Sequence, residues 1–286
     1  MGESRRRARE GAWALATKSA LVAALAMWVL MAEPVEWARA ADPSSSPDRF
    51  DVVVLDAGHG GHDEGATGPS GLREKDLVLD VTRRLAERLE RAGVGVILTR
   101  KNDRFLSLEE RTAVANDAGA DLFVSIHANA ARSRRPSGIE TYFASLEASD
   151  DQARETAERE NLAFGSASPA LEQADPLAAI LGDLIATQHL QESSEFAKLA
   201  QRELAELSKA SSRGVKQAPF VVLMGVQMPA SLVEIGFLTN PEEEKGLRRK
   251  RHREAIARAL EDAIAAFAAR YDERRGVRQS GRSPDR

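Results

Sequence analysis

The sequence predicts an α/β fold, in which helices pack on the faces of a β-sheet. Short β-branched or apolar runs at residues 52–55 and 122–126 indicate buried strands. Apolar residues four apart mark a helix with one buried face between them: Leu77, Val81, Leu85 and Leu89. Strands that alternate with helices imply a sheet covered by helices. In such sheets, the crevice for a ligand forms beyond the carboxyl ends of the strands.

The first forty residues are expected to be a signal peptide. An arginine-rich start precedes an uninterrupted apolar stretch at residues 20–32, which is short for a membrane span. Ala38-Arg39-Ala40 then offers a small-residue cleavage site. The alternative is an uncleaved membrane anchor. We therefore expect an exported protein with no stable membrane anchor after residues 1–40 are removed.

The remaining elements follow in order after a polar linker at residues 41–49. Strands are expected at residues 52–55, 94–99, 122–126, 138–143, 220–223 and 231–235. Helices are expected from Glu74 to Gly93, at 107–118 behind a capping box, at 194–209, and after Asn240-Pro241. The last helix should bury Ile256, Leu260, Ile264 and Phe267. Residues 272–286 are expected to be a disordered basic tail.

Residues 144–192 interrupt this alternation and are interpreted as an insertion. A charged helical stretch at 146–159 is followed by a break rich in small residues at 165–169. Asp175-Pro176 then supplies a helix cap with proline at the first helical position. The residues after it have the apolar spacing of a short amphipathic helix that ends near Gln188.

Composition excludes several classes of function. The formal net charge is -4, so nothing in the overall charge indicates a nucleic-acid partner. The chain has no cysteine, which excludes thiolate metal sites and cysteine nucleophiles. Any bound metal must be held by histidine or carboxylate side chains.

Two histidines are candidate metal ligands because of where they lie. His59 sits in a glycine-flanked turn directly after the strand at 52–55, and His127 ends the strand at 122–126. Both are therefore expected at the carboxyl edge of the sheet, despite their separation in sequence. His62 is a weaker candidate, three residues beyond His59.

Two glutamates could complete a hydrolytic zinc site. Glu74 opens a helix, and from its charged neighbours alone it would be a solvated residue stabilised by the helix dipole. Glu234 lies inside the apolar run 232–237, where an unpaired carboxylate is costly to bury. It either pairs with a base such as Arg111 or works in a cleft. Two imidazoles and a carboxylate can bind Zn²⁺, and a further carboxylate can take a proton from water.

Four segments together resemble a known family. They are Leu55-Asp56-Ala57-Gly58-His59-Gly60-Gly61, Leu72-Arg73-Glu74-Lys75-Asp76, Ser125-Ile126-His127-Ala128-Asn129-Ala130 and Leu232-Val233-Glu234-Ile235-Gly236-Phe237-Leu238-Thr239-Asn240. In this order they resemble the motifs of the zinc-dependent N-acetylmuramoyl-L-alanine amidases of the amidase-3 type. The resemblance extends over roughly residues 51–267.

The resemblance implies one Zn²⁺ per chain, held by His59, Glu74 and His127, with Glu234 as the catalytic carboxylate. It implies a single α/β domain at residues 50–271, with a twisted, mostly parallel sheet of about six strands and helices on both faces. Such enzymes hydrolyse the amide between N-acetylmuramic acid and L-alanine of peptidoglycan stem peptides. Export agrees, because that substrate lies in the periplasm or the extracellular cell-wall space.

The insertion resembles the extra region of amidases used in daughter-cell separation. In those enzymes a helix covers the zinc until an activator protein displaces it. The helix that begins at Asp175 is the candidate for this role here, and Glu160, Glu172 or Asp175 could supply the blocking carboxylate. The alternative is a structural extension without an inhibitory role. We expect a monomer that acts on peptidoglycan.

Two other functions remain possible from the residues. One is another exported zinc hydrolase, such as a peptidase or a carbohydrate deacetylase, because these also need zinc and a carboxylate. The other is a wall-binding regulator that has lost catalysis, for which an incomplete ligand set would be the sign. The order of the four motifs disfavours the first, and the complete ligand set disfavours the second.

Overall fold

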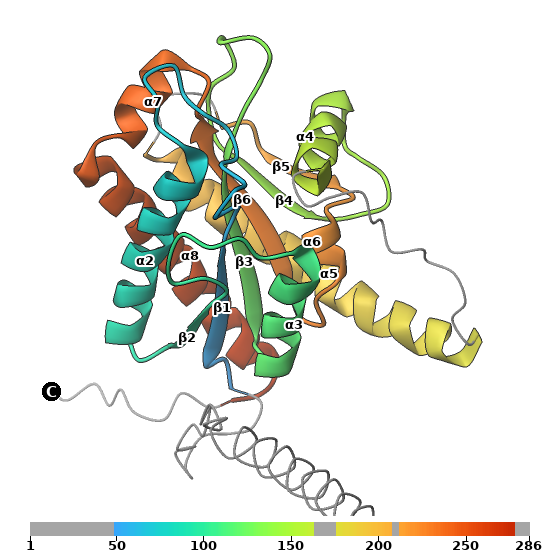
Figure 1. Ribbon diagram of the computed structural model, residues 1–286. Helices are drawn as coiled ribbons and strands as arrows, with labels where there is room; N and C mark the ends of the chain where they lie inside the picture. Colours follow the sequence, from blue (N-terminus) through green and yellow to red (C-terminus); the bar gives the residue numbers. More distant parts are fainter. Residues whose placement is uncertain (1–48, 163–175, 208–211, 278–286) are drawn as a thin grey trace, which may run out of the picture. The chain divides into compact units, whose positions relative to one another are not determined.

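The computed structural model describes residues 49–162, 176–207 and 212–277, except for the side chains of 176–187 (Figure 1). Its strands are β1 (Val52–Ala57), β2 (Gly95–Leu98), β3 (Leu122–Asn129), β4 (Glu140–Ala144), β5 (Val215–Ala218) and β6 (Ala230–Phe237). Its helices are α2 (Glu74–Arg91), α3 (Leu108–Ala118), α4 (Asp151–Leu162), α5 (Pro176–Ala205), α6 (Val221–Met224), α7 (Pro241–Leu247) and α8 (Lys250–Arg274). The predicted signal peptide and most of the predicted linker lie outside the described residues.

The six strands of the described residues form one sheet in the order β2-β1-β3-β6-β4-β5. Strands β2, β1, β3 and β6 run parallel, whereas β4 runs antiparallel to β6 and parallel to β5. The predicted single α/β domain with a mostly parallel sheet is therefore confirmed. Because β4 is reversed, its first residue lies at the edge where β1, β3 and β6 end.

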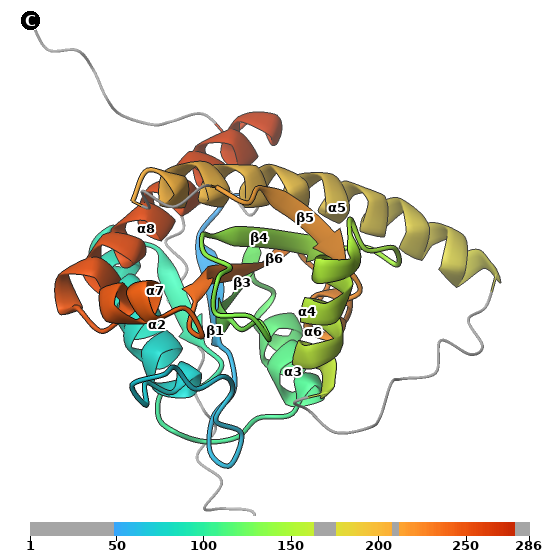
Figure 2. The same ribbon diagram turned by 90° about the horizontal axis from the view of Figure 1, so that it is seen from above.

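Helices cover both faces of the sheet, as predicted. One apolar core joins a sheet face to α2, α5 and α8, and a second joins the other face to α3, α4 and α6 (Figure 2). Along β1, Val53 and Leu55 belong to the first core and Val54 to the second. This alternation follows from the two-residue period of a strand, and it explains why the run at 52–55 is apolar throughout.

The helix ends follow the sequence signals in two places. Ser107 and Glu110 form the predicted capping box at the start of α3. Asn240 accepts hydrogen bonds from the backbone N–H groups of Glu242 and Glu243, and so caps α7. The core of the last helix is also confirmed, since Ile256, Leu260, Ile264 and Phe267 are fully buried in α8, a list that matches the prediction.

Three predicted elements are wrong in type or extent. Residues 220–223 were expected to be a strand, but Val221–Met224 form α6 with Phe220 as its N-cap, and β5 lies just before them. A short apolar run does not show which of the two it forms, because periodicity cannot separate them. The helices expected at 175–188 and 194–209 are one continuous helix, α5.

The first residues of the predicted tail, 272–274, belong to α8, and residues 278–286 lie outside the described residues. Arg274 and Arg275 contact the carboxylates of Glu192 and Glu195 on α5, which holds the end of α8 against that helix. Among the described residues, no helix combines the length and the apolar character that crossing a bilayer requires.

Candidate metal centre

The sheet brings the two candidate histidines to one edge, as predicted. His59 follows the carboxyl end of β1, and His127 lies near the end of β3, the neighbouring strand. Glu234 on β6 is the direct register partner of His127. On the other side of β6, Glu140 at the start of β4 is the register partner of Glu234. Three acidic or imidazole side chains therefore lie side by side across β3, β6 and β4.

The turn that carries His59 is fixed by buried arginines. His59 has a left-handed backbone, with φ 58°. Arg100 donates hydrogen bonds to the carbonyl oxygens of Ala57 and Gly58, and Arg111 donates to those of Ala57 and His59. These bonds satisfy the carbonyl groups of the turn and stabilise a conformation that is uncommon for a residue with a side chain.

The imidazole of His59 is oriented by a nearby carboxylate. Its Nδ1 lies 2.8 Å from Oδ2 of Asp63, which leaves Nε2 facing the centre of the site. The other oxygen of Asp63 accepts the backbone N–H of Gly65. A carboxylate on the far nitrogen is the usual way to fix the tautomer and orientation of a metal-binding histidine.

His127 is oriented by packing. A side chain at position 58 would place its first carbon 2.4 to 2.7 Å from three atoms of the His127 ring. Gly58 therefore lets the backbone of the turn approach the imidazole face, which is the role expected of a glycine in this turn.

Glu74 is buried and faces the two histidines, so the reading of it as a solvated helix start is wrong. Its Oε1 accepts the backbone N–H of Ala128, and its Oε2 accepts that of Ala66. Only 2% of the residue is exposed. The charged residues beside it hid this position from the local sequence pattern, and only the resemblance predicted it.

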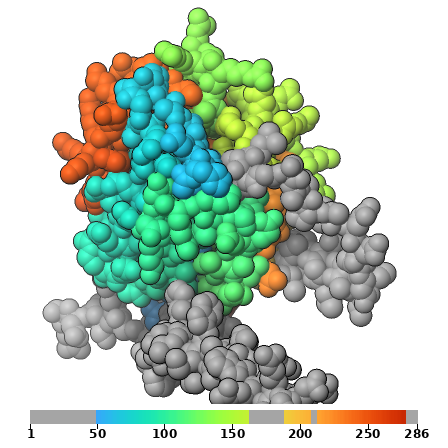
Figure 3. All heavy atoms as spheres, in the orientation of Figure 1, coloured from blue at the N-terminus to red at the C-terminus, as the bar shows by residue number. Residues whose placement is uncertain are grey.

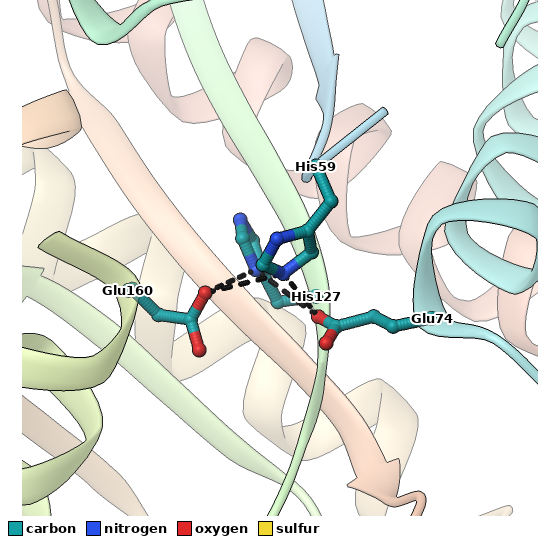
Figure 4. A group of neighbouring side chains, drawn as sticks. All are labelled: His59, Glu74, His127 and Glu160. Carbon is teal, nitrogen blue, oxygen red and sulfur yellow. Dashed lines mark ion pairs between the residues drawn. The ribbon is translucent and has the colours of Figure 1, made fainter. Parts of the chain in front are cut away.

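A fourth side chain, Glu160 on α4, completes a buried cluster (Figure 4). Nε2 of His59 lies 3.0 Å from Oε1 of Glu74 and 3.3 Å from Oε2 of Glu160. Nδ1 of His127 lies 3.2 Å and 3.0 Å from the same two oxygens. All four ligand atoms lie within 4.8 Å of one another.

This cluster fits a bound metal ion. Nδ1 of His127 and Oε2 of Glu160 are buried and, among the described residues, make no hydrogen bond despite their short separation. Four ligands of a tetrahedral Zn²⁺ at about 2.0–2.1 Å would be about 3.3 Å apart. The measured separations of 3.0 to 3.3 Å between imidazole and carboxylate atoms match that spacing. Imidazole and carboxylate groups are also the ligands that Zn²⁺ accepts.

Opposite charges within the cluster shift the pKa values of one another towards the charged forms. Burial lowers the pKa of His127, but the carboxylates of Glu160 and Glu74 outweigh it and raise that pKa to about 10. Burial raises the pKa of Glu74, yet His59 and His127 lower it to about 2. Burial raises the pKa of Glu160 as well, yet His127 and His59 hold it well below its ordinary value. Both carboxylates therefore carry negative charge, which is the state that binds a cation.

Glu234 lies beside this cluster without belonging to it. The residue is fully buried, and neither of its carboxylate oxygens has a hydrogen-bond partner among the described residues. Burial raises the pKa of Glu234 well above its ordinary value, and the nearby carboxylates of Glu160 and Glu74 raise it further. A buried carboxylate without partners is rare in a structural role, because desolvation is then uncompensated.

Arg111 is not the partner of Glu234, contrary to one expectation from the sequence. Its Nη1 lies 2.6 Å from Oδ1 of Asp56 on β1. The weaker ligand candidate, His62, is exposed and stacks against the ring of Phe105 at 4.2 Å between ring centres. It lies outside the cluster of four.

The sequence matches the N-acetylmuramoyl-L-alanine amidase family over residues 53–266. The chain belongs to this family. It is 36% identical over 223 residues to N-acetylmuramoyl-L-alanine amidase AmiA of Escherichia coli (strain K12), which covers 77% of each chain. It is also 36% identical over 226 residues to AmiC of Escherichia coli O6:H1, covering 78% of this chain and 54% of that one.

A solved structure of the same kind agrees with this amidase fold. N-acetylmuramoyl-L-alanine amidase AmiC2 of Nostoc punctiforme is 28% identical, with a TM-score of 0.57. The match covers 77% of this chain and 97% of that one. The alternative of an unrelated zinc peptidase or deacetylase therefore finds no support.

Proposed function

We propose that this amidase hydrolyses the amide bond between N-acetylmuramic acid and L-alanine of peptidoglycan stem peptides. The observation that carries this proposal is the buried cluster of His59, Glu74, His127 and Glu160 at the carboxyl edge of the sheet. It lies within the residues that match the amidase family. A site of this composition is suited to hydrolysis, and the complete set of ligands argues against a regulator that has lost catalysis.

His59, Glu74 and His127 would hold one Zn²⁺, as the resemblance implies. They come from the body of the domain, and each is fixed by its own contacts: Asp63 for His59, two backbone N–H groups for Glu74, and the close approach of Gly58 for His127. When bound, zinc lowers the pKa of water and polarises a carbonyl group.

Glu234 is proposed as the general base. It is positioned on an interior strand, next to His127, with both oxygens free of hydrogen bonds to the described residues. Such a carboxylate can accept a proton from the attacking water and deliver it to the nitrogen of the leaving L-alanine. Its position in register with a ligand keeps it close to the reacting atoms.

The test is digestion of purified peptidoglycan, with the released fragments identified by mass spectrometry. We expect intact stem peptides beginning with L-alanine, and their release should stop in a chelator. Glu234→Gln should retain zinc but lose at least about a hundredfold in rate, the usual contribution of a general base. Glu242→Gln, at an exposed position on α7, serves as the control. Fragments cut elsewhere, or activity retained in Glu234→Gln, would contradict the proposal.

We further propose that α4 holds the site closed, and not the helix expected to begin at Asp175, which is the first part of α5. Of the three carboxylates considered for this role, Glu172 and Asp175 lie outside the described residues, whereas Glu160 reaches the cluster from α4. With zinc bound, this carboxylate would be a fourth ligand, in place of the water that a hydrolytic zinc site needs. Ala153, Thr156, Ala157 and Glu160 form the buried face of α4. An activator protein that withdraws α4 would then open the site.

Replacement of Glu160 tests this closure. Glu160→Ala should raise the basal rate by about tenfold or more, because the closed state loses the attraction between this carboxylate and the cluster, and each loss of about 1.4 kcal/mol is tenfold. Zinc should remain bound through the other three ligands. Arg154→Ala, exposed on the same helix and outside the cluster, should leave the basal rate unchanged. An unchanged basal rate in Glu160→Ala, with zinc retained, would contradict autoinhibition.

The proposed cellular role is cell-wall remodelling and daughter-cell separation outside the cytoplasm. Two features support it: the export signal expected at residues 1–40 and the closure by α4, which would restrict hydrolysis to the place where an activator is present. Imaging of cells that lack the protein tests the role. Chains of unseparated cells are expected, and normal separation would count against it.

A further inference from the structure

A cavity of about 510 Å³ lies beside the metal cluster. Its walls come from α4, from the start of β4, and from the loop at residues 130–138 that joins β3 to β4. This loop projects at the top of the face in Figure 3. Asn129, which ends β3, and Arg159, which precedes Glu160, both line the cavity, so it adjoins the cluster.

Arg213 forms part of the wall and is held there by the body of the domain. Its Nε donates to Oε1 of Glu140 at 2.7 Å, and its guanidinium lies 5.1 Å from the ring centre of Phe237. Its Nη2 is occupied from the other side, by the side-chain oxygen of Gln152 on α4. The guanidinium is thus fixed in orientation, while one of its donors is used only by the helix proposed to leave.

One wall of the cavity comes from α4 and the other from the body of the domain, and the charges on these two walls are complementary. The body contributes Arg132, which is exposed and makes no ion pair with the described residues, together with Arg213. The carboxylate of Glu140, which also lines the cavity, is neutralised by Arg213 and Lys216. Helix α4 contributes Glu155 and Glu158.

Two polar residues link the cavity to the cluster. Arg159 of α4 lines the cavity as well, but its guanidinium is engaged by Oδ1 of Asn129 at 2.8 Å and by Glu160. In the closed arrangement, α4 therefore presents an amide oxygen and carboxylates to a wall that carries the arginines of the body.

We propose that this cavity is the subsite for a free carboxylate of the stem peptide, bound by Arg213 and Arg132. The inference rests on the proposed function. A stem peptide carries free carboxylates beyond its L-alanine, and a guanidinium with a fixed orientation recognises a carboxylate through paired N–H donors. The side-chain oxygen of Gln152 marks the position that an oxygen of the substrate takes when α4 withdraws.

The test compares two soluble muropeptides that differ only in whether the stem-peptide carboxylate is free or amidated. The full chain should cleave the free acid with the higher kcat/KM. In Arg213→Gln and Arg132→Gln, kcat/KM for the free acid should fall by about tenfold or more, with little change for the amide. Arg202→Gln, at an exposed position on α5, is the matched control. Lys216 remains beside Glu140 in Arg213→Gln, so this carboxylate keeps a cation.

A variant that binds the peptide more tightly distinguishes an effect on recognition from an effect on folding. Gln152 is exposed on α4, and Gln152→Ala should tighten the binding of the free stem peptide, measured by calorimetry, because it frees Nη2 of Arg213. Equal losses on both muropeptides, or no preference in the unmodified chain, would overturn the inference while leaving the amidase activity intact. Absence of cleavage by both the unmodified chain and Glu160→Ala would instead contradict the proposed function, and calorimetry would still decide whether the subsite exists.

Discussion

His59 and His127 are held at the metal centre by different means. His59 depends on the hydrogen bond between its Nδ1 and Asp63, whereas His127 depends on the close approach of Gly58 to its ring. A bond to a carboxylate also raises the basicity of the ligating nitrogen, which packing does not. The two ligands should therefore respond differently to changes in their surroundings.

Replacing Asp63 should weaken zinc binding without removing a ligand. Asp63→Asn can keep the bond to the backbone of Gly65 but replaces the carboxylate that faces His59. We expect zinc affinity to fall by about 10–100-fold, measured by competition with a chromogenic chelator. Glu64→Gln, on the exposed neighbouring residue, should bind zinc like the unmodified chain. Equal affinities for Asp63→Asn and the unmodified chain would show that His59 needs no orienting carboxylate.

The buried pair of Asp56 and Arg111 should make stability depend on pH. Burial raises the pKa of Asp56, but Arg111, Thr99 and Ser125 outweigh it and hold that pKa below its ordinary value of 3.8. The stabilisation is therefore complete above about pH 4 and is lost as the pH falls through the lower folded pKa. Asp56→Asn should cost about 3–5 kcal/mol at pH 7, because Arg111 is left as an unpaired buried charge.

Urea denaturation at pH 7, 5 and 3.5 measures this dependence. The difference between the unmodified chain and Asp56→Asn should be similar at pH 7 and 5 and smaller at pH 3.5. Asp262→Asn, at an exposed position on α8, should show no difference at any of these pH values. A stability difference that widens as the pH falls would contradict a lowered pKa for Asp56.

At the scale of elements, the short helix α7 ties together two loops that border the site. Glu244 accepts backbone N–H groups of Ser70 and Leu72, in the loop that leads to Glu74. Glu243 accepts those of Gly138 and Phe237, between the projecting loop and β6. Two consecutive carboxylates at the start of one helix thereby hold the loops on either side of the cluster.

Loss of the Glu244 contacts should loosen the loop before Glu74. In Glu244→Gln, one carboxylate oxygen becomes an amide donor that cannot accept the N–H of Ser70 or Leu72. Loss of a charge-assisted hydrogen bond costs about 1.5–3 kcal/mol, so the hydrogens of these backbone amides should exchange about tenfold or more faster. Hydrogen exchange followed by mass spectrometry of residues 66–73 measures the change, with Glu242→Gln as control. Unaltered protection of this peptide would show that α7 does not hold the loop.

At the scale of the whole molecule, metal binding should add to the stability of the fold. The cluster joins residues that follow β1, open α2, end β3 and lie on α4. Zinc at about a hundred times its dissociation constant would add about 2.7 kcal/mol, or about 5–10 °C in Tm for a domain of this size. A chelator should lower Tm by this amount in calorimetry. His59→Ala should lose the shift, and an unmodified chain whose Tm ignores zinc would contradict a metal site here.

Much of this molecule could be predicted from its sequence because the strongest signals are local. The apolar strand runs and the glycine-flanked turn fix where β1, β3 and His59 lie. The role of Glu160 could not be chosen in the same way, because it sits in a charged helix that carries four acidic residues, Asp151, Glu155, Glu158 and Glu160. Only the tertiary packing of α4 decides which carboxylate faces the cluster. The prediction of a strand at residues 220–223 was wrong for a related reason, since this short apolar run suits either a strand or a helix.

The proposed base, Glu234, is carried by an interior strand that is paired on both sides, whereas α4 and the loop that carries Arg132 lie beside the carboxyl edge of the sheet. The proposed base and the proposed carboxylate subsite therefore lie in separable parts of the chain. An engineer could graft a different loop between β3 and β4 to retarget the enzyme towards other peptides, and the hydrolytic step itself should survive the exchange.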